Sequence, residues 1–150
     1  PMLAIVDSRL QTPMDARLWT APQRQVVVYG AVDDDARMQA LRAQGADVVI
    51  VPNTEGKVDL AAVLLDLGRR EINELHVEAG GQLNGALFRA GLVDELLLYQ
   101  APVLLGQGPG IAALGPLGAL ADGVTLAVHD VQRIGPDVRW LARTARTLAF

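Results

Sequence analysis

The feature that most constrains the fold is a repeated alternation of short apolar runs with segments of helical periodicity. Apolar runs at residues 2–6, 26–29, 47–51 and 75–78 each lead into a polar or glycine-containing loop, as strands buried on both faces do. Strands separated by helices imply right-handed crossovers and a mainly parallel sheet. Ligands of such sheets bind at the carboxyl ends of the strands. We therefore expect an α/β fold with a candidate site at that edge.

Three helices are predicted between these runs. The clearest covers residues 59–68, where Asp59 is the expected N-cap and leucine and valine recur at intervals of three and four. A second begins at the aspartates 33–35, which favour the positive end of a helix dipole, and ends at Ala43. A third covers residues 82–90. These helices are expected to flank the sheet.

The last third of the sequence has a different pattern. A fifth strand is predicted at residues 95–100, followed by a stretch punctuated by glycine and proline. Residues 124–134 and 138–144 then alternate around a Gly-Pro-Asp turn, as the strands of a hairpin do. The predicted fold class is therefore α/β, with a mainly parallel sheet, flanking helices and a C-terminal antiparallel hairpin at the sheet's edge.

Length and composition limit the classes of function. The 150 residues suit a single domain, 1–150, which can bury about 70% of its unfolded surface. A net charge of −4 argues against nucleic acid or an anionic membrane as the main partner. The absence of cysteine excludes disulfides and a thiolate nucleophile, and two distant histidines argue against a metal site. No apolar run is long enough for a membrane span, and we predict a cytoplasmic protein.

The main candidate site lies within residues 75–90, predicted as a strand, a turn at Gly80 and Gly81, and a helix. The unpaired N–H groups and the dipole at a helix N-terminus favour an anion, which predicts a phosphate-binding turn. The residues alone equally allow a tight strand-to-helix connection without a ligand. Glu78, at the predicted strand's last position, can either bind a polar substrate or meet the N–H groups of the helix's first turn.

Other candidates are weaker. The glycine-rich stretch at 106–110 superficially suggests a dinucleotide fingerprint, but Pro109 lacks a donor, so a plain loop that could line the same pocket is expected. Ser8 follows the first strand and can cap its loop. His76 and His129 show no pattern of a catalytic triad, and we assign no catalytic histidine.

Two stretches carry a resemblance to a known family. Residues 76–108, HVEAGGQLNGALFRAGLVDELLLYQAPVLLGQG, and residues 6–18, VDSRLQTPMDARL, resemble the reductase domain of the riboflavin-biosynthesis deaminase/reductase family. The resemblance implies a dihydrofolate-reductase-like fold. It also implies NADPH-dependent reduction of the ribosyl group of a ribosylaminopyrimidine, of the 5-amino-6-(5-phosphoribosylamino)uracil type, in riboflavin biosynthesis. The cofactor would supply the hydride, so the protein's task is binding and orientation.

The resemblance also implies roles for particular residues. Glu78 matches a substrate-contacting glutamate, and Ser8 matches a cofactor-contacting serine. The remaining matches to cofactor-binding positions are Gly80, Gly81, Gln82, Leu83, Asn84, Gly85 and Ala86. No catalytic side chain and no metal ligand are implied.

The family's reductase domains begin with another strand, a loop and a helix ahead of the position of Met2, and often follow a zinc deaminase domain. We therefore expect this chain to be the C-terminal portion of a pyrimidine reductase domain, insufficient alone for full activity. The expected partner is a small-molecule substrate, with a linked deaminase domain and a homodimer as further possibilities. The alternative is a non-catalytic nucleotide-binding or assembly domain of the same fold.

Overall fold

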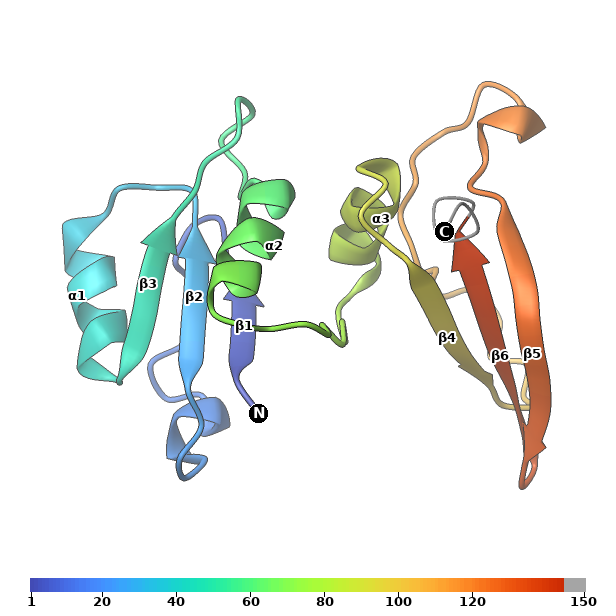
Figure 1. Cartoon of the computed structure of the whole chain (residues 1–150), viewed down its shortest axis with the longest axis horizontal. Coiled ribbons are helices and arrows are strands. Elements are labelled where there is room, and N and C mark those ends of the chain that lie inside the picture. The colour runs from blue at the N-terminus through green and yellow to red at the C-terminus, as the bar shows by residue number, and fades with distance from the viewer. Residues whose placement is uncertain (145–150) are drawn as a thin grey trace. The chain divides into compact units, whose positions relative to one another are not determined.

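The computed structural model describes residues 1–144, and the chain divides into two compact units, Pro1–Glu74 and Leu75–Phe150. The first unit contains a parallel three-stranded sheet in the order β1-β2-β3 (Figure 1). Its strands are β1 (Leu3–Val6), β2 (Val26–Gly30) and β3 (Ala46–Ile50), and its helices are α1 (Asp35–Ala43), α2 (Leu60–Arg69) and the short 3-10 helix η1 (Arg17–Thr20). The predicted strands and helices of this half are confirmed, with ends shifted by one or two residues.

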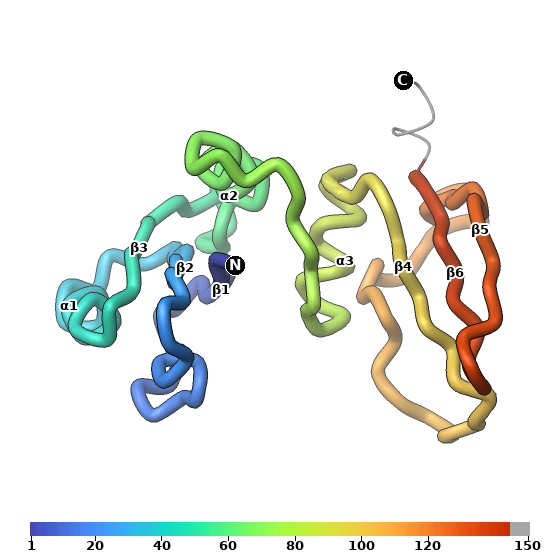
Figure 2. Tube along the Cα trace, turned by 60° about the horizontal axis from the view of Figure 1, so that its bottom comes forward, coloured from blue at the N-terminus to red at the C-terminus, as the bar shows by residue number. Residues whose placement is uncertain are grey.

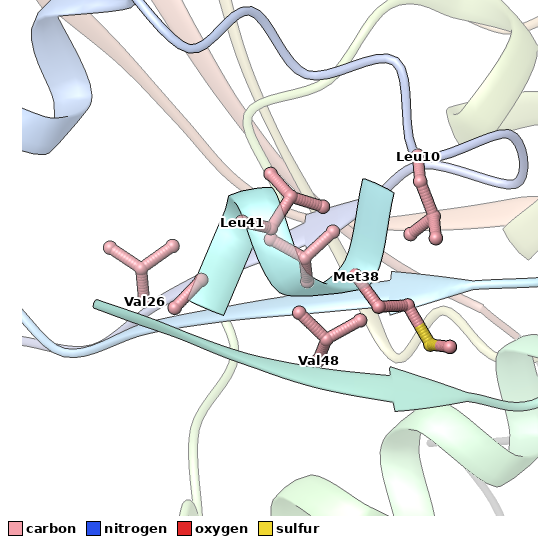
Figure 3. Close-up of a cluster of buried hydrophobic side chains, with 7 residues drawn as sticks. Leu10, Val26, Met38, Leu41 and Val48 are labelled. Atoms are coloured by element: carbon pink, nitrogen blue, oxygen red, sulfur yellow. The ribbon is translucent and has the colours of Figure 1, made fainter. Parts of the chain in front are cut away.

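Two hydrophobic clusters cover opposite faces of this sheet. Val26 and Val28 of β2 pack in one cluster with Met38 and Leu41 of α1 (Figure 3). The alternate residues Val27 and Tyr29 pack in the other, with side chains of α2, chiefly Val63 and Leu67. Because successive strand residues point to opposite faces, α1 and α2 lie on the two sides of the sheet. All five residues of β2 are buried, which explains the continuous apolar run.

Aspartate caps fix where both helices of this unit begin. The Asp59 carboxylate accepts a hydrogen bond from the Ala62 N–H at 3.0 Å, as predicted for the start of α2. In the same way, Asp34 accepts from the Arg37 N–H at 3.0 Å at the start of α1. Each cap satisfies a first-turn donor that has no partner within the helix.

The second unit contains one helix and an antiparallel sheet in the order β4-β6-β5. Its elements are α3 (Gly81–Arg89), β4 (Glu95–Gln100), the short 3-10 helix η2 (Leu120–Asp122), β5 (Leu126–Ile134) and β6 (Asp137–Thr144). The predicted hairpin is confirmed as β5 and β6, which turn at Gly135 with a φ of 61°. The strand predicted at 95–100 is also confirmed, but it pairs antiparallel with β6. The expected place of the hairpin at the edge of the parallel sheet is wrong, because β4, β6 and β5 form a sheet of their own. The mixed α/β fold class is thus confirmed.

The strand predicted at residues 75–78 is wrong. Residues 72–80 form an extended run without secondary structure between α2 and α3 (Figures 1 and 2). Leu75 and Val77 keep exposed fractions of 40% and 43%. An apolar alternation becomes a strand only where a neighbouring strand supplies ladder hydrogen bonds, and neither sheet includes this run.

Candidate functional site

The turn before α3 has the backbone geometry of an open helix N-terminus. Its N-cap, Gly80, has φ −75° and ψ 164° and makes no side-chain capping bond. The Asn84 N–H donates to the Gly80 carbonyl at 3.2 Å, which is the first bond of the helix. The N–H groups of Gly81, Gln82 and Leu83 come before this donor and have no acceptor within the helix. These three donors and the helix dipole can together bind an anion.

The two glycines of this turn differ in what surrounds them. A Cβ at Gly81 would lie 2.6 Å from the Gly110 carbonyl oxygen, so packing within the chain requires a glycine there. A Cβ at Gly80 would meet nothing within 4 Å, and its φ is negative. Packing therefore accounts for Gly81 and leaves the presence of glycine at position 80 unexplained.

Residues 110–113, here called the strap, lie directly along α3. The Ala113 N–H donates to the Gly81 carbonyl at 2.8 Å, and the Arg89 guanidinium donates to the Ala113 carbonyl. A Cβ at Gly85 would lie 2.6 Å from the carbonyl carbon and 2.8 Å from the nitrogen of Ala113. The glycine-rich stretch at 106–110 is a loop, as predicted, and it leads into the strap. The strap was not predictable from the sequence, because no periodicity marks it.

Glu78 lies in the extended run two residues before Gly80. Its side chain is 86% exposed, and one carboxylate oxygen lies 3.7 Å from Nε2 of His76. Glu78 therefore does not cap α3, whose N-cap receives no side-chain bond. Of the two interpretations of this carboxylate, the helix-terminus partner is not what the structure shows.

Ser8 belongs to the first unit, whereas Glu78 and the turn belong to the second. Its Oγ accepts a hydrogen bond from the Val58 N–H at 3.2 Å, and its carbonyl accepts from the Ala31 N–H at 3.1 Å. Ser8 thus joins the loops that follow β1 and β2 to the residues preceding α2. The hydroxyl keeps its own proton for a further acceptor.

Asp7, beside Ser8, organises the loop after β1. One carboxylate oxygen accepts from the backbone N–H and the hydroxyl of Thr12, at 2.6 and 2.7 Å. Burial opposes the charge, but these bonds and those from the N–H groups of Gln11 and Arg9 outweigh it and lower the pKa of Asp7. This carboxylate has a structural role in the loop.

A second polar network in the first unit contains Tyr29, which the sequence did not single out. The buried Tyr29 hydroxyl donates to Asp66 at 2.8 Å, and the Arg70 guanidinium donates to Asp66 at 2.7 Å and to Asp47 at 2.6 Å. Burial and the adjacent Asp66 raise the pKa of Tyr29. The network joins β2, β3 and α2, and the i, i+4 spacing of Asp66 and Arg70 was its only sequence signal.

Two further findings concern the residues that the structure describes. Among residues 1–144, no group of three or more histidine, aspartate and glutamate side chains is placed to hold a metal ion. Within the same range, no helix has the length and apolar character needed to cross a membrane.

The sequence of this chain is similar to that of known proteins. Residues 1–140 match the model of the RibD C-terminal domain. The riboflavin biosynthesis protein RibD of Escherichia coli (strain K12) is 43% identical over 91 residues, which are 60% of this chain and 25% of that protein. The 5-amino-6-(5-phosphoribosylamino)uracil reductase of Buchnera aphidicola subsp. Acyrthosiphon pisum (strain APS) is 30% identical over 92 residues, 61% of this chain and 44% of that protein. The chain thus spans less than half the length of both relatives.

Solved structures show the same fold. A structure of Acinetobacter baumannii RibD has a TM-score of 0.75 and 24% identity, and covers 95% of this chain and 37% of that one. At this level of identity the likeness supports the fold, while the domain match over residues 1–140 supports the family. The chain therefore belongs to the RibD C-terminal domain family, whose relatives include proteins named as a riboflavin biosynthesis protein and as a 5-amino-6-(5-phosphoribosylamino)uracil reductase.

Proposed function

We propose that this chain takes part in NADPH-dependent reduction of the ribosyl group of a ribosylaminopyrimidine phosphate, such as 5-amino-6-(5-phosphoribosylamino)uracil, in riboflavin biosynthesis. The observation that carries the proposal is the match to the RibD C-terminal domain over residues 1–140. The relative from Buchnera is named as a reductase of this uracil compound. The reaction needs a hydride, which a nicotinamide cofactor supplies when bound.

The turn before α3 supports a site for the cofactor's pyrophosphate. Gly80 lies where no packing demands a glycine, and a missing side chain is what allows a bulky anion to approach the backbone. The first-turn N–H groups of Gly81, Gln82 and Leu83 are the donors we assign to that anion. Gly85 and Ala86 extend the same segment along α3. Ser8 is proposed as a further contact to the cofactor through its remaining hydroxyl proton.

Glu78 is the residue we assign to the substrate. Its carboxylate is 86% exposed and is an acceptor for the hydroxyl or amino groups of a ribosylaminopyrimidine. It lies two residues before the proposed phosphate site in sequence. A polar substrate bound by Glu78 would therefore lie next to a cofactor bound at the turn.

The test of the cofactor site is titration of the full chain with NADPH, followed by fluorescence or calorimetry, with a Gly80→Ser variant. A Cβ at position 80 would meet no atom within 4 Å, and serine is a good N-cap, so the melting temperature should be unchanged. NADPH affinity should fall about tenfold or more, or ~1.4 kcal/mol. Equal affinity in both proteins would refute the assignment of the turn to the cofactor.

A second candidate is a non-catalytic nucleotide-binding or assembly domain of the same fold. The observation that favours it is that the turn offers backbone donors for an anion, whereas Glu78 is the one side chain that we assign to a substrate. A reductase assay with the ribosylaminopyrimidine phosphate and NADPH separates the two candidates. Binding of NADPH without any turnover, in a protein that includes the remainder of the relatives' length, would support the second.

The proposal extends to the wider assembly. A deaminase domain linked upstream and a cytoplasmic location accompany the proposed reaction. We also propose a homodimer, supported by β5, which within residues 1–144 pairs with β6 alone and exposes 55% of Val128 and 50% of Val131. A monomer by sedimentation at micromolar concentration would contradict the dimer.

A further inference from the structure

The side chain of Asn84 binds two carbonyl groups, one just before the proposed phosphate turn and one in the strap. Its Nδ2 donates to the Ala79 carbonyl at 3.2 Å and to the Ile111 carbonyl at 2.9 Å. An amide nitrogen carries two hydrogens, so both are used. The Asn84 backbone N–H is also used, because it donates to the Gly80 carbonyl at 3.2 Å. Asn84 therefore keeps no donor for a phosphate, although it matches a cofactor-binding position.

The bond to Ala79 determines the direction of the next peptide group. The chain has no cis peptide bond among the described residues, so the carbonyl of Ala79 and the N–H of Gly80 point in opposite directions from one rigid plane. Glycine lacks the Cβ that limits φ, so the Ala79–Gly80 peptide is less restricted than a peptide that precedes another residue type. By holding the Ala79 carbonyl, Asn84 fixes where the Gly80 N–H points.

The bond to Ile111 fixes the strap at the same place. Three side-chain or backbone bonds now hold the strap on α3, from Asn84, from Arg89 and from the Ala113 N–H to the Gly81 carbonyl. Gly81 and Gly85 permit this close approach, since a Cβ at either would meet strap or adjacent backbone atoms. The strap in turn limits movement of the helix's first turn.

From these contacts we infer that Asn84 is a positioning residue, which holds the Ala79–Gly80 peptide and the strap so that the Gly80 N–H points to the same anion as the first-turn N–H groups of α3. This inference rests on the proposed cofactor site. It assigns to Asn84 an indirect role, through the backbone, in place of a direct contact with phosphate. Because the neutral amide donates a hydrogen bond to each of these two carbonyl oxygens, it also weakens the repulsion that they would exert on an anion.

The test compares Asn84→Ala with Asn73→Ala in the full chain. Asn73 is exposed in the extended run and provides the same chemical change at a position without a proposed role. We expect Asn84→Ala to raise the Kd for NADPH about tenfold and Asn73→Ala to leave it unchanged. Asn84→Ser, whose hydroxyl can donate to only one carbonyl, should give an intermediate Kd. A Kd for Asn84→Ala within twofold of wild type would overturn the inference.

Amide hydrogen exchange by NMR gives a readout that needs no ligand. Exchange of the amide at position 84, which bonds to the Gly80 carbonyl, and of the Ala113 amide, which bonds to the Gly81 carbonyl, should become faster in Asn84→Ala and stay unchanged in α1 and α2. If wild-type protein binds no NADPH, the proposed function fails, and exchange alone then decides the position of the turn. Unchanged exchange would overturn the role of Asn84. If Asn84→Ala does not fold, Arg89→Met, which releases the strap from the other end of α3, should show the same faster exchange at Ala113.

Discussion

Replacing the helical glycines by alanine tests the close packing of the strap. Alanine in place of glycine inside a helix ordinarily stabilises by about 0.5–1 kcal/mol. At Gly68 of α2 a Cβ would meet nothing within 4 Å, so Gly68→Ala should show that gain. At Gly85 a Cβ would lie 2.6 and 2.8 Å from backbone atoms of Ala113, which cannot rotate aside. Overpacking of this kind costs about 1–3 kcal/mol, so Gly85→Ala should destabilise.

The measurement is urea unfolding followed by tryptophan fluorescence. Trp140 lies on β6, in the unit of Gly85, and Trp19 lies in the unit of Gly68. A Trp19→Phe background therefore isolates the transition of the second unit. Gly85→Ala should lower this midpoint, and Gly68→Ala should leave it unchanged. In a Trp140→Phe background, which leaves Trp19 as the probe of the first unit, Gly68→Ala should raise the midpoint of that unit. A gain of stability in Gly85→Ala equal to that in Gly68→Ala would refute the packing of the strap on α3.

Two further predictions concern polar networks of the first unit. Tyr29→Phe removes the hydroxyl that donates to Asp66 at 2.8 Å and should destabilise the first unit by about 1 kcal/mol, measured by urea unfolding; an unchanged midpoint would contradict a role for this bond. Asp7→Asn should lower stability at pH 7 by about 1 kcal/mol. Because the folded state lowers the pKa of Asp7, its contribution is present above the unfolded pKa of about 4 and is lost as the pH falls through the folded pKa. The difference between wild type and Asp7→Asn should therefore shrink in acid, and a difference that grows below pH 4 would contradict this assignment.

Sequence reasoning succeeded where local signals and burial agree. The start of α2 followed from Asp59 and its apolar spacing, and the five buried residues of β2 followed from an uninterrupted apolar run. It failed at residues 75–78, where an alternating pattern predicts a strand but no neighbouring strand supplies the ladder. A strand depends on a partner distant in sequence, whereas a capped amphipathic helix depends mainly on its own residues.

The candidate site was partly predictable for the same reason. The glycine pair and the helix after it were visible in the sequence, and α3 begins at Gly81. The different roles of Gly80 and Gly81 were not, because they depend on where the Gly110 carbonyl lies. The two bonds of Asn84 likewise depend on Ile111, 27 positions away in sequence.

The extended run between α2 and α3 exposes the backbone there to proteolysis. A protease binds its substrate as an extended strand, and residues 72–80 already have that form, without secondary structure to be unfolded first. Glu74 and Glu78 are exposed there, so a glutamate-specific endoprotease has its cleavage sites at the boundary of the two compact units. Cleavage within this run would separate the parallel sheet from the turn, the strap and the hairpin.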